Sequence, residues 1–436
     1  MKRLIEAELV SWKDSVGRKP LILRGARQVG KTWLVEQFLA KQFEGFVKID
    51  FEKRRDLRSV FEENLEPRRI LGSLEIASGR ITPGKTLLFL DEIQACPQAL
   101  ASLRYFYEEL PDLHIVAAGS LLEFALGEIS VPVGRLSYQR VGPMSFQEYL
   151  LALGKETMAE ALQGEPEAIS SHSHEQILKE LRNYFFVGGM PEAVKVWCET
   201  GSLRETARVH EELLQSLRDD FSKYTPRVAR DCLESVLQNA AQSVGEQLKY
   251  TKLDGGHTGP TNRKAFDLLC KARLLQRIPA CDPSGLPLGA SANPVKFKAA
   301  LLDIGLMQRA CRLPLETAIE AGDLLSLYRG KLAEQFVAQE MLAAGGGDLF
   351  YWAREAPSSS AEVDFLAVRA GKIHPVEVKA GEAGSLRSLH LFLKTYPQCG
   401  EALVLSTRTP ARLTDQRLRF LPLYFASRLE RREFEG

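Results

Sequence analysis

The chain has 436 residues, which exceeds the length of one ordinary domain and suggests about three. Lysine and arginine total 57 against 56 aspartate and glutamate residues, so the overall charge favours no particular partner and any basic surface must be local. The 7 cysteines are scattered and never form a C-x-x-C pair, which argues against a disulfide framework and a zinc site.

Three features of the sequence bear on where in the cell the protein is located. The first ten residues mix charged and apolar side chains and lack the apolar core of a signal peptide. No run approaches ~18 consecutive apolar residues, so no transmembrane span and no membrane partner are predicted. Scattered cysteines are most simply explained as reduced intracellular thiols. We therefore expect a cytoplasmic protein.

Residues 25–32 fit the pattern G-x-x-x-x-G-K-[ST] of a phosphate-binding loop. A strand-type apolar run at 20–24 precedes the loop and a helical period at 33–39 follows it, which is the context that the pattern requires. The glycines let the backbone turn so that N–H groups face phosphate oxygens at the start of a helix. We expect the nucleotide to be bound by Gly25, Ala26, Arg27, Gln28, Val29, Gly30, Lys31 and Thr32.

Two side chains of the loop carry the expected chemistry. Lys31 would reach the β- and γ-phosphates, and the hydroxyl of Thr32 would bind Mg²⁺. The alternative is a glycine turn before a helix with a solvated lysine, but the complete pattern in the correct frame favours the phosphate loop.

Residues 1–150 alternate between strand and helix patterns, which predicts an α/β domain whose mostly parallel sheet is covered on both faces. A strand is expected at 46–51, a helix within 52–66, and a buried strand before Asp91 and Glu92. Ligands gather at such strand ends. Asp91 would hold Mg²⁺ through water, and Glu92 would polarise the water that attacks the γ-phosphate. An isolated acidic pair is commonly a helix cap, but the upstream loop favours the catalytic role.

Ser120 and Arg135 are further candidates for the catalytic site. Ser120 ends the apolar strand 114–120, where AAA-type ATPases have the polar residue called sensor 1. It is equally suited to cap the next helix, because Glu123 completes a capping box. Arg135 would stabilise transition-state charge as an arginine finger, within its own subunit or toward a neighbour, or it is an ordinary surface arginine.

These motifs resemble those of a family of prokaryotic AAA-type ATPases. The likeness covers nearly the whole chain and is carried by residues 25–32, 90–94, 119–120, 134–135, 143–146 and 187–194. Members of that family carry a C-terminal domain of uncharacterised function that is similar to PD-(D/E)XK nucleases. The resemblance implies ATP and Mg²⁺ as cofactors and a helical lid that closes over the nucleotide.

The middle of the chain is predicted to be helical and then mixed. Residues 151–227 have helical spacing, interrupted by a polar run at 170–174 that is expected to be a solvated loop. From 228 to 300, a helix beginning at Thr261 followed by a strand near 272–278 looks like a winged helix. If this part binds DNA, the helix would enter the major groove while Arg263, Lys264, Lys271, Arg273 and Arg277 meet phosphates. A winged helix that makes only protein contacts is equally open.

Four charged residues form a second constellation in the C-terminal third. Glu334 lies in an amphipathic helix, Asp364 in a strand, and Glu377 with Lys379 in the next strand, after a tight hairpin. Strand alternation and hairpin pairing should bring the last three together. The set resembles the PD-(D/E)XK nuclease arrangement, with Val363 in place of proline, and implies a site for one or two Mg²⁺ ions. The alternative is a salt-bridged cluster in an inactive fold.

The sequence therefore predicts an ATPase domain at 1–150, a helical lid at 151–227, a winged-helix-like domain at 228–300 and a nuclease-like α/β domain at 301–436. In one hypothesis, ATP hydrolysis is coupled to a DNA-facing nuclease-like module. In the other, nucleotide binding controls protein assembly and the C-terminal domain is an inactive interaction module. An arginine donated to a neighbouring subunit would require an oligomer.

Overall fold

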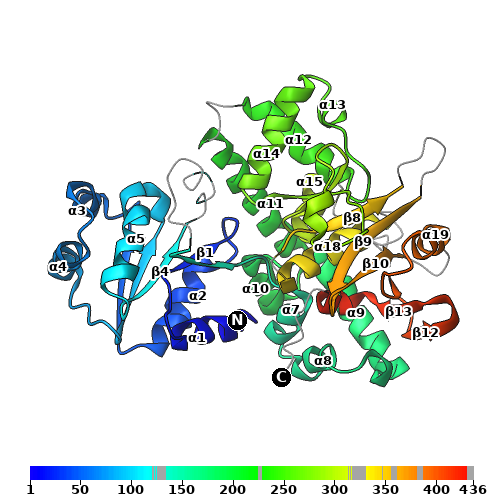
Figure 1. Cartoon of the computed structure of the whole chain (residues 1–436), viewed down its shortest axis with the longest axis horizontal. Helices are drawn as coiled ribbons and strands as arrows, with labels where there is room; N and C mark the ends of the chain where they lie inside the picture. The colour runs from blue at the N-terminus through cyan, green and yellow to red at the C-terminus, as the bar shows by residue number, and fades with distance from the viewer. Residues whose placement is uncertain are drawn as a thin grey trace. The chain divides into compact units, whose positions relative to one another are not determined.

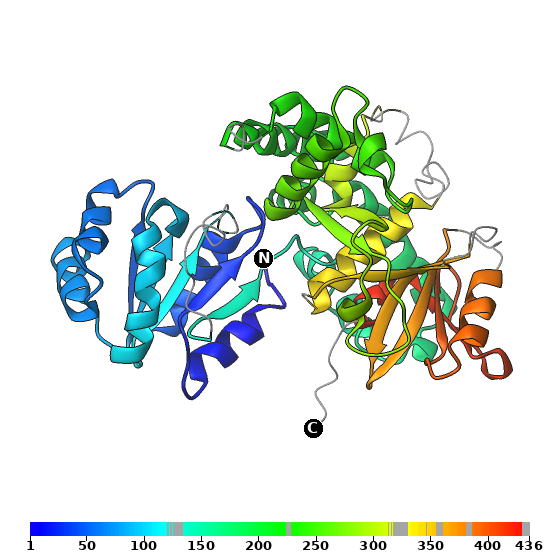
Figure 2. The same ribbon diagram turned by 45° about the horizontal axis from the view of Figure 1, so that its top comes forward.

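The computed structural model describes residues 1–119, 122, 124, 134–223, 228–312, 314, 316, 330–345, 347–354, 361–380 and 386–429. Its chain divides into two compact units (Figures 1 and 2). The first consists almost entirely of Lys2–Gly142, and the second of Pro143–Cys270 and Leu274–Gly436. The nucleotide motifs lie in the first unit and the C-terminal constellation in the second.

The first unit contains a sheet of 5 parallel strands in the order β2-β3-β4-β1-β5. Every residue of β3 and β4 is buried, as expected for parallel strands that are covered on both faces. This confirms the predicted α/β architecture of the N-terminal part. The strands are β1 (Leu21–Arg24), β2 (Gly45–Asp50), β3 (Thr86–Asp91), β4 (His114–Ala118) and β5 (Ser137–Arg140).

Helices cover both faces of this sheet. Phe61, Leu74 and Leu103 belong to one core with Leu88 and Leu90 of β3, so α3, α4 and α5 pack on the same face. Figure 1 shows α1 and α2 on the other side. Burying each large apolar side chain stabilises the fold by about 1.5–3 kcal/mol. The helices are α1 (Glu6–Asp14), α2 (Lys31–Gln37), α3 (Arg58–Glu63), α4 (Pro67–Ser78) and α5 (Pro97–Glu109).

The second unit begins with helices, as the spacing of 151–227 predicts. Pro191 occupies the first turn of α10, where its missing N–H is not needed. Later in the chain, α18 and α19 pack against the C-terminal sheet. The helices of this unit are α7 (Phe146–Ala152), α8 (Glu156–Ala161), α9 (Ser171–Val187), α10 (Pro191–Thr200), α11 (Leu203–Asp219), α12 (Arg230–Gln242), α13 (Tyr250–Leu253), α14 (Gly259–Lys271), α15 (Ile304–Ala310), α18 (Lys331–Gly345) and α19 (Arg387–Thr395).

The expected solvated loop at 170–174 is wrong. Ser170 caps α9 by accepting a hydrogen bond from the Ser173 N–H, so the helix starts at Ser171. His174 lies on the buried face of that helix, and its ring nitrogens are 2.7 Å from the Tyr424 hydroxyl and 3.0 Å from the Thr407 carbonyl. The polar composition concealed a helix start.

A two-stranded antiparallel sheet follows α12, α13 and α14. It consists of β6 (Leu275–Pro279) and β7 (Phe297–Leu301), and Leu248 adds an isolated antiparallel bridge to Phe297. This order of three helices and a hairpin contains the helix and the strand that the sequence predicts. The winged-helix assignment stays a prediction.

The C-terminal sheet has 6 strands in the order β12-β13-β11-β10-β9-β8. Val363 of β9 packs in a core with Phe392 of α19, whereas its neighbour Asp364 faces the opposite side, because strand side chains alternate. The predicted tight hairpin joins β9 and β10. The strands are β8 (Phe350–Ala353), β9 (Glu362–Arg369), β10 (Lys372–Val378), β11 (Ala402–Ser406), β12 (Ala411–Leu413) and β13 (Leu418–Pro422).

The segments 143–146 and 187–194 meet in the second unit. The Met144 N–H donates to the Gly189 carbonyl at 2.6 Å, and a Cβ on Gly189 would lie 2.0 Å from the Met144 carbonyl oxygen. The Gly189 N–H in turn donates to the buried Asp303 carboxylate at 2.6 Å. Gly188 has a φ of 65°, which glycine adopts without strain. The glycine pair is therefore needed for close backbone packing.

Candidate nucleotide site and carboxylate cluster

The phosphate loop joins β1 to α2 and has the backbone that its glycines predict. Gly30 has a φ of 90°, and Gln28, although not a glycine, has a φ of 63°. A Cβ on Gly25 would lie 2.0 Å from the Val141 carbonyl oxygen, so no other residue fits there without a shift of the backbone. Loop residues in such conformations turn successive N–H groups toward one concave side, which suits an anion.

Lys31 is folded back onto this loop. Its ammonium donates to the carbonyls of Ala26 at 2.7 Å and Gly25 at 3.0 Å, and the residue is only 7% exposed. Burial lowers the pKa of Lys31 to about 8, against the opposing influence of Glu92 and Asp91. A buried cation held mainly by carbonyls is poorly compensated. It therefore offers a binding site for the negative charge of a phosphate.

Thr32 and Asp91 lie side by side, as a shared magnesium site requires. The Thr32 hydroxyl is 3.1 Å from an Asp91 carboxylate oxygen, and Asp91 is buried at the end of β3. A hydroxyl and a carboxylate are oxygen ligands that suit Mg²⁺, so the two residues fit the ion. The ammonium of Lys48 on β2 lies 2.9 Å from the same Asp91 oxygen. Sequence reasoning missed Lys48, although its place in the neighbouring strand was predicted.

Glu92 is held by Gln94, a residue to which the sequence motifs assign no role. Glu92 has a φ of 50°, and its carboxylate accepts a hydrogen bond from the Gln94 side chain at 2.6 Å. The carbonyl oxygen of that side chain lies against Gly119, where a Cβ would come within 2.0 Å of it. Gln94 and Gly119 thus fix the position of Glu92. The sequence contained a signal for this contact, since residues 90–94 and 119 both belong to motifs that resemble those of AAA-type ATPases.

Ser120 and Arg135 are the two remaining candidates of this site. Ser120 lies outside the described residues. The Arg135 guanidinium is 3.0 Å from the Glu108 carboxylate of α5, and its side chain is 45% exposed. Arg104 also pairs with Glu108, at 3.1 Å. The role of Arg135 as an arginine finger stays a prediction.

Arg3 supports the phosphate loop from the N-terminal segment. Its guanidinium donates to the Val29 carbonyl at 3.1 Å and to the Gly142 carbonyl at 2.8 Å, and the residue is buried. It joins the loop to the segment that follows β5. No sequence pattern marks this contact, because the three positions are far apart in the chain.

In the second unit, the four predicted residues of the C-terminal constellation are brought together by the sheet and α18. The Val378 N–H donates to Asp364 at 2.8 Å, and the Lys379 ammonium is 2.5 Å from a Glu377 oxygen. Glu377 is 7% exposed, and its second oxygen, Oε2, is buried without a hydrogen-bond partner. The expected pairing across the hairpin is therefore present.

Lys298 enters the same cluster and was missed by sequence reasoning. From β7 its ammonium lies 3.3 Å from Glu334 and 3.4 Å from Asp364, and it also pairs with Glu362. Lys298 is 1% exposed. Burial opposes its charge, but Asp364, Glu334 and Glu362 outweigh that effect and raise its pKa. A lysine within the apolar strand 297–301 was the signal that could have identified it.

The charges of this cluster do not cancel. Four carboxylates (Glu334, Glu362, Asp364 and Glu377) and two ammonium groups (Lys298 and Lys379) leave a net charge of −2 when all are ionised. Burial, with Asp364, raises the pKa of Glu334 to about 8 and that of Glu377 to about 7. The unpartnered Glu377 oxygen beside Asp364 fits either a proton or a divalent cation, because both relieve the repulsion between these buried carboxylates.

One other group among the described residues could offer metal ligands: Cys232, Asp254 and His257. A His257 ring nitrogen is already 2.7 Å from the Asp254 carboxylate. Burial raises the pKa of the Cys232 thiol to about 11, whereas a metal requires the thiolate. This group therefore offers no strong site. Within the described ranges, no helix has both the length and the apolar character to cross a membrane.

Comparison with family models identifies three segments. Residues 17–150 match the AAA domain, residues 178–317 match a domain of unknown function (DUF8612), and residues 329–425 match another domain of unknown function (DUF4143). Residues 17–150 form a P-loop AAA-type ATPase domain. This AAA domain contains the loop, Asp91 and Glu92. The descriptions of the other two segments name no activity.

No curated protein matches the chain. Among solved structures, the Walker-type ATPase PABY2304 of Pyrococcus abyssi is 16% identical with a TM-score of 0.46, over 72% of this chain and 96% of its own. The RuvB Holliday junction branch migration motor of Thermotoga maritima is 16% identical with a TM-score of 0.29, over 63% and 89%. With TM-scores below 0.5, these likenesses carry no argument about function.

Proposed function

We propose that the AAA domain binds Mg²⁺-ATP and hydrolyses it. The observation that carries this proposal is the distance of 3.1 Å between the Thr32 hydroxyl and an Asp91 carboxylate oxygen. Thr32 directly follows the buried Lys31 in the chain. The loop N–H groups and Lys31 would hold the phosphates. Mg²⁺, held by Thr32 and Asp91, would neutralise charge on the β- and γ-phosphates.

Glu92 is the residue that would act on water. Its carboxylate, oriented by Gln94, would accept a hydrogen bond from the water that attacks the γ-phosphorus, and the bond to the ADP oxygen would break. Because the transition state is loose, the site acts mainly through positioning and charge. Arg135 would contribute a positive charge, in its own subunit or in a neighbouring copy.

Steady-state ATP hydrolysis tests this proposal. Lys31→Ala should abolish turnover and weaken nucleotide binding, whereas Glu92→Gln should lower turnover by ~10²-fold or more while ATP still binds. Lys53→Ala, which changes an exposed lysine of the same unit, is the matched control. Wild-type turnover equal to that of Lys31→Ala would contradict the proposal.

We further propose that nucleotide state is coupled to a DNA-facing second unit. The segments proposed as lid (151–227) and winged helix (228–300) would transmit the change. Arg263, Lys264 and Lys271 are exposed on α14, as phosphate contacts must be. Arg277 instead pairs with Asp267 and donates to the Tyr250 hydroxyl at 2.9 Å. ATPase rates measured with and without DNA test the coupling, and identical rates would count against it.

The carboxylate cluster supports a metal-dependent nuclease activity within this proposal. Asp364 and Glu377 would hold Mg²⁺, which would supply the positive charge for phosphodiester cleavage. Lys379, at 2.5 Å from Glu377, would orient or deprotonate the attacking water. Glu377→Gln should abolish Mn²⁺ binding measured by calorimetry and the nicking of plasmid DNA. Asp348→Asn, which changes an exposed carboxylate of the same unit, should change neither.

A second candidate function is favoured by Lys298. Its ammonium already compensates three carboxylates, as expected of an inactive module that retains the fold. In that case the protein is a nucleotide-controlled assembly switch. Absence of both Mn²⁺ binding and DNA cleavage, with ATP binding intact, would select this function over the nuclease.

A further inference from the structure

A groove of about 740 Å³ lies in the second unit. One side is formed by α11, and the other by Arg309 at the end of α15 and by Arg312, Pro314 and Glu316 after it. Its lining is dominated by five arginines: Arg204, Arg208, Arg218, Arg309 and Arg312. Only two acidic residues, Glu211 and Glu316, line it among the described residues. The groove therefore carries an excess of positive charge, although the whole chain is nearly neutral.

Most of these guanidinium groups lack a counter-ion. Within the part of the chain that the structure describes, the side chains of Arg204, Arg218 and Arg312 make no ion pair or hydrogen bond. The Nε of Arg218 is moreover buried. Arg204 and Arg312 are exposed, whereas Arg218 is partly buried. An unpaired and partly desolvated cation such as Arg218 is costly, so a bound anion is expected beside it.

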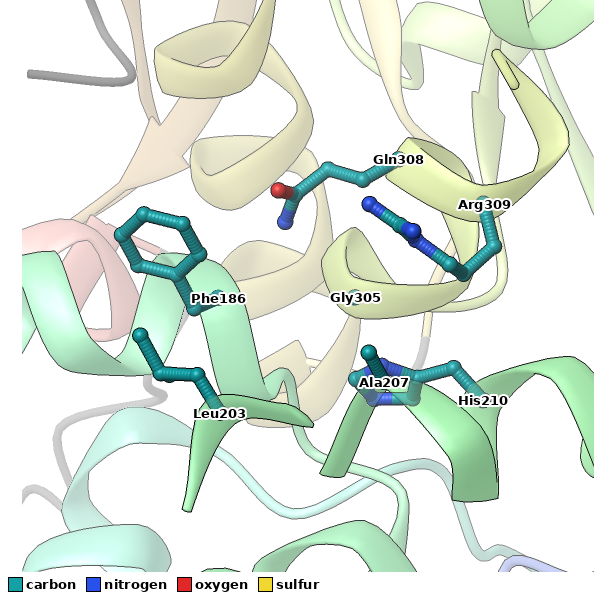
Figure 3. Close-up of a pocket in the computed structure, with 7 residues that line it drawn as sticks. All are labelled: Phe186, Leu203, Ala207, His210, Gly305, Gln308 and Arg309. Carbon is teal, nitrogen blue, oxygen red and sulfur yellow. The ribbon is translucent and has the colours of Figure 1, made fainter. Parts of the chain in front are cut away.

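Arg309 shows that the groove is a formed part of the fold and not merely a solvated helix face. Its side chain is only 9% exposed, and its ion pair with Glu211 spans 4.0 Å. Figure 3 shows Arg309 of α15 near His210 and Ala207 of α11, around an adjoining cavity of about 10 Å³. That cavity holds no more than a water molecule, so the larger groove is the candidate site.

Three arginines of α11 lie in a row on one helix face. Arg204, Arg208 and Arg218 share this face with Glu211 and Gln215, because these five positions are separated by three or four residues. At 1.5 Å per residue, Arg204 and Arg218 are roughly 21 Å apart along the helix. A row of this length is longer than a single phosphate group and fits a polymer with repeated negative charge.

We propose that this groove binds the sugar–phosphate backbone of a nucleic acid. The inference rests on the proposed DNA-facing role and names a surface for it that is separate from α14. Guanidinium groups bind phosphates through paired, charge-assisted hydrogen bonds. The described lining has no aromatic residue to stack on a base, so recognition is through phosphates and independent of sequence.

Two other ligand classes fit the groove less well. A small nucleotide would leave most of the row unpaired, and its base would meet only Ala207, Leu214 and Pro314 as apolar neighbours among the described lining residues. An acidic polypeptide carries flexible, singly charged carboxylates, whereas phosphates recur at a fixed interval along a nucleic-acid strand. The spread of arginines along the whole groove, from Arg204 to Arg218, therefore favours the nucleic acid.

Fluorescence anisotropy with a labelled single strand of about 30 nucleotides, and with the duplex of the same sequence, tests this inference on the full chain. The variant Arg204→Gln/Arg218→Gln/Arg312→Gln should bind at least tenfold more weakly. The slope of log affinity against log salt should fall by about 2–3, because each arginine that meets a phosphate contributes about one unit. The preferred probe identifies whether the groove takes a single strand or a duplex.

The matched control removes the same charge from α14, with Arg263→Gln/Lys264→Gln/Lys271→Gln. If only this control loses DNA binding, the groove inference is overturned while the DNA-facing function survives. If the wild-type chain binds neither probe, both are overturned. Poly-glutamate that competes as well as DNA would replace the nucleic acid by an acidic polypeptide. Circular dichroism melting should show the groove variant folded, because the three side chains make no ion pair within the described residues.

Discussion

Two buried lysines, one in each unit, respond in opposite ways to similar burial. Lys31 of the phosphate loop is 7% exposed and Lys298 of the carboxylate cluster is 1% exposed. Burial lowers the pKa of Lys31 to about 8, because carbonyls are its nearest partners. The pKa of Lys298 is instead raised, since three carboxylates outweigh the burial.

The difference shows which region is prepared for an anion. Lys31 retains a charge that the protein compensates poorly, so a triphosphate would supply what is missing. Lys298 is already paired with three carboxylates, and the raised pKa values of Glu334 and Glu377 show that this region favours added protons or cations over anions. The two regions therefore have complementary electrostatics: the first accepts phosphate and the second accepts positive charge.

The strongest test of this comparison replaces each lysine by methionine. Lys298→Met should lower the free energy of unfolding by about 3–5 kcal/mol, because it leaves buried carboxylates uncompensated. Lys31→Met should cause no such loss, since it removes a poorly compensated buried charge. Urea denaturation followed by circular dichroism measures both. Equal stabilities of the two variants would contradict the comparison.

His210 extends the comparison to a buried group with no acidic partner. Burial lowers its pKa to about 4, and Nε2 donates to the Val187 carbonyl at 2.8 Å. Between its unfolded pKa of ~6.5 and about 4, the unfolded chain binds more protons, so stability falls as the pH is lowered, by about 3 kcal/mol in total. Urea titrations from pH 7 to pH 4 measure this loss. His210→Asn should reduce the slope, and an unchanged slope would refute the assignment.

Ligand addition should separate the two units. Mg²⁺-ATP at about 100 times its dissociation constant should stabilise the AAA domain by about 2.7 kcal/mol, which a thermal melt detects. Lys31→Met should abolish this shift, whereas Lys298→Met should retain it. If the shift survives Lys31→Met, the ammonium does not contact the nucleotide.

Arg3 offers the smallest expected effect and a check on the loop itself. Arg3→Ala removes two hydrogen bonds to the backbone at Val29 and Gly142, which should weaken ATP binding by about 1–2 kcal/mol through a less ordered loop. Titration with a fluorescent ATP analogue measures the change. Lys2→Ala is the neighbouring control, and equal affinities for the two variants would exclude a supporting role.

Much of the fold was predictable because its signals are local. The apolar strands of the AAA domain, the hairpin between β9 and β10, and Pro191 at the start of α10 follow from residues close together in sequence. The helix that begins at Ser171 after its cap Ser170 was missed, since serine and histidine suit both a loop and a capped helix. Its buried face depends on Tyr424, which is distant in the chain.

The sequence by itself identified the phosphate loop, the acidic end of β3, and the helix–strand–strand series that carries Glu334, Asp364, Glu377 and Lys379. These features depend on motif spacing, which encodes local backbone geometry. Only the tertiary structure placed Arg3 under the loop, Lys48 beside Asp91, Lys298 among the carboxylates, and Arg309 opposite the row on α11. Each of these contacts joins groups from different elements. Electrostatic energy depends on their distance and burial in space, which the order of residues along the chain does not contain.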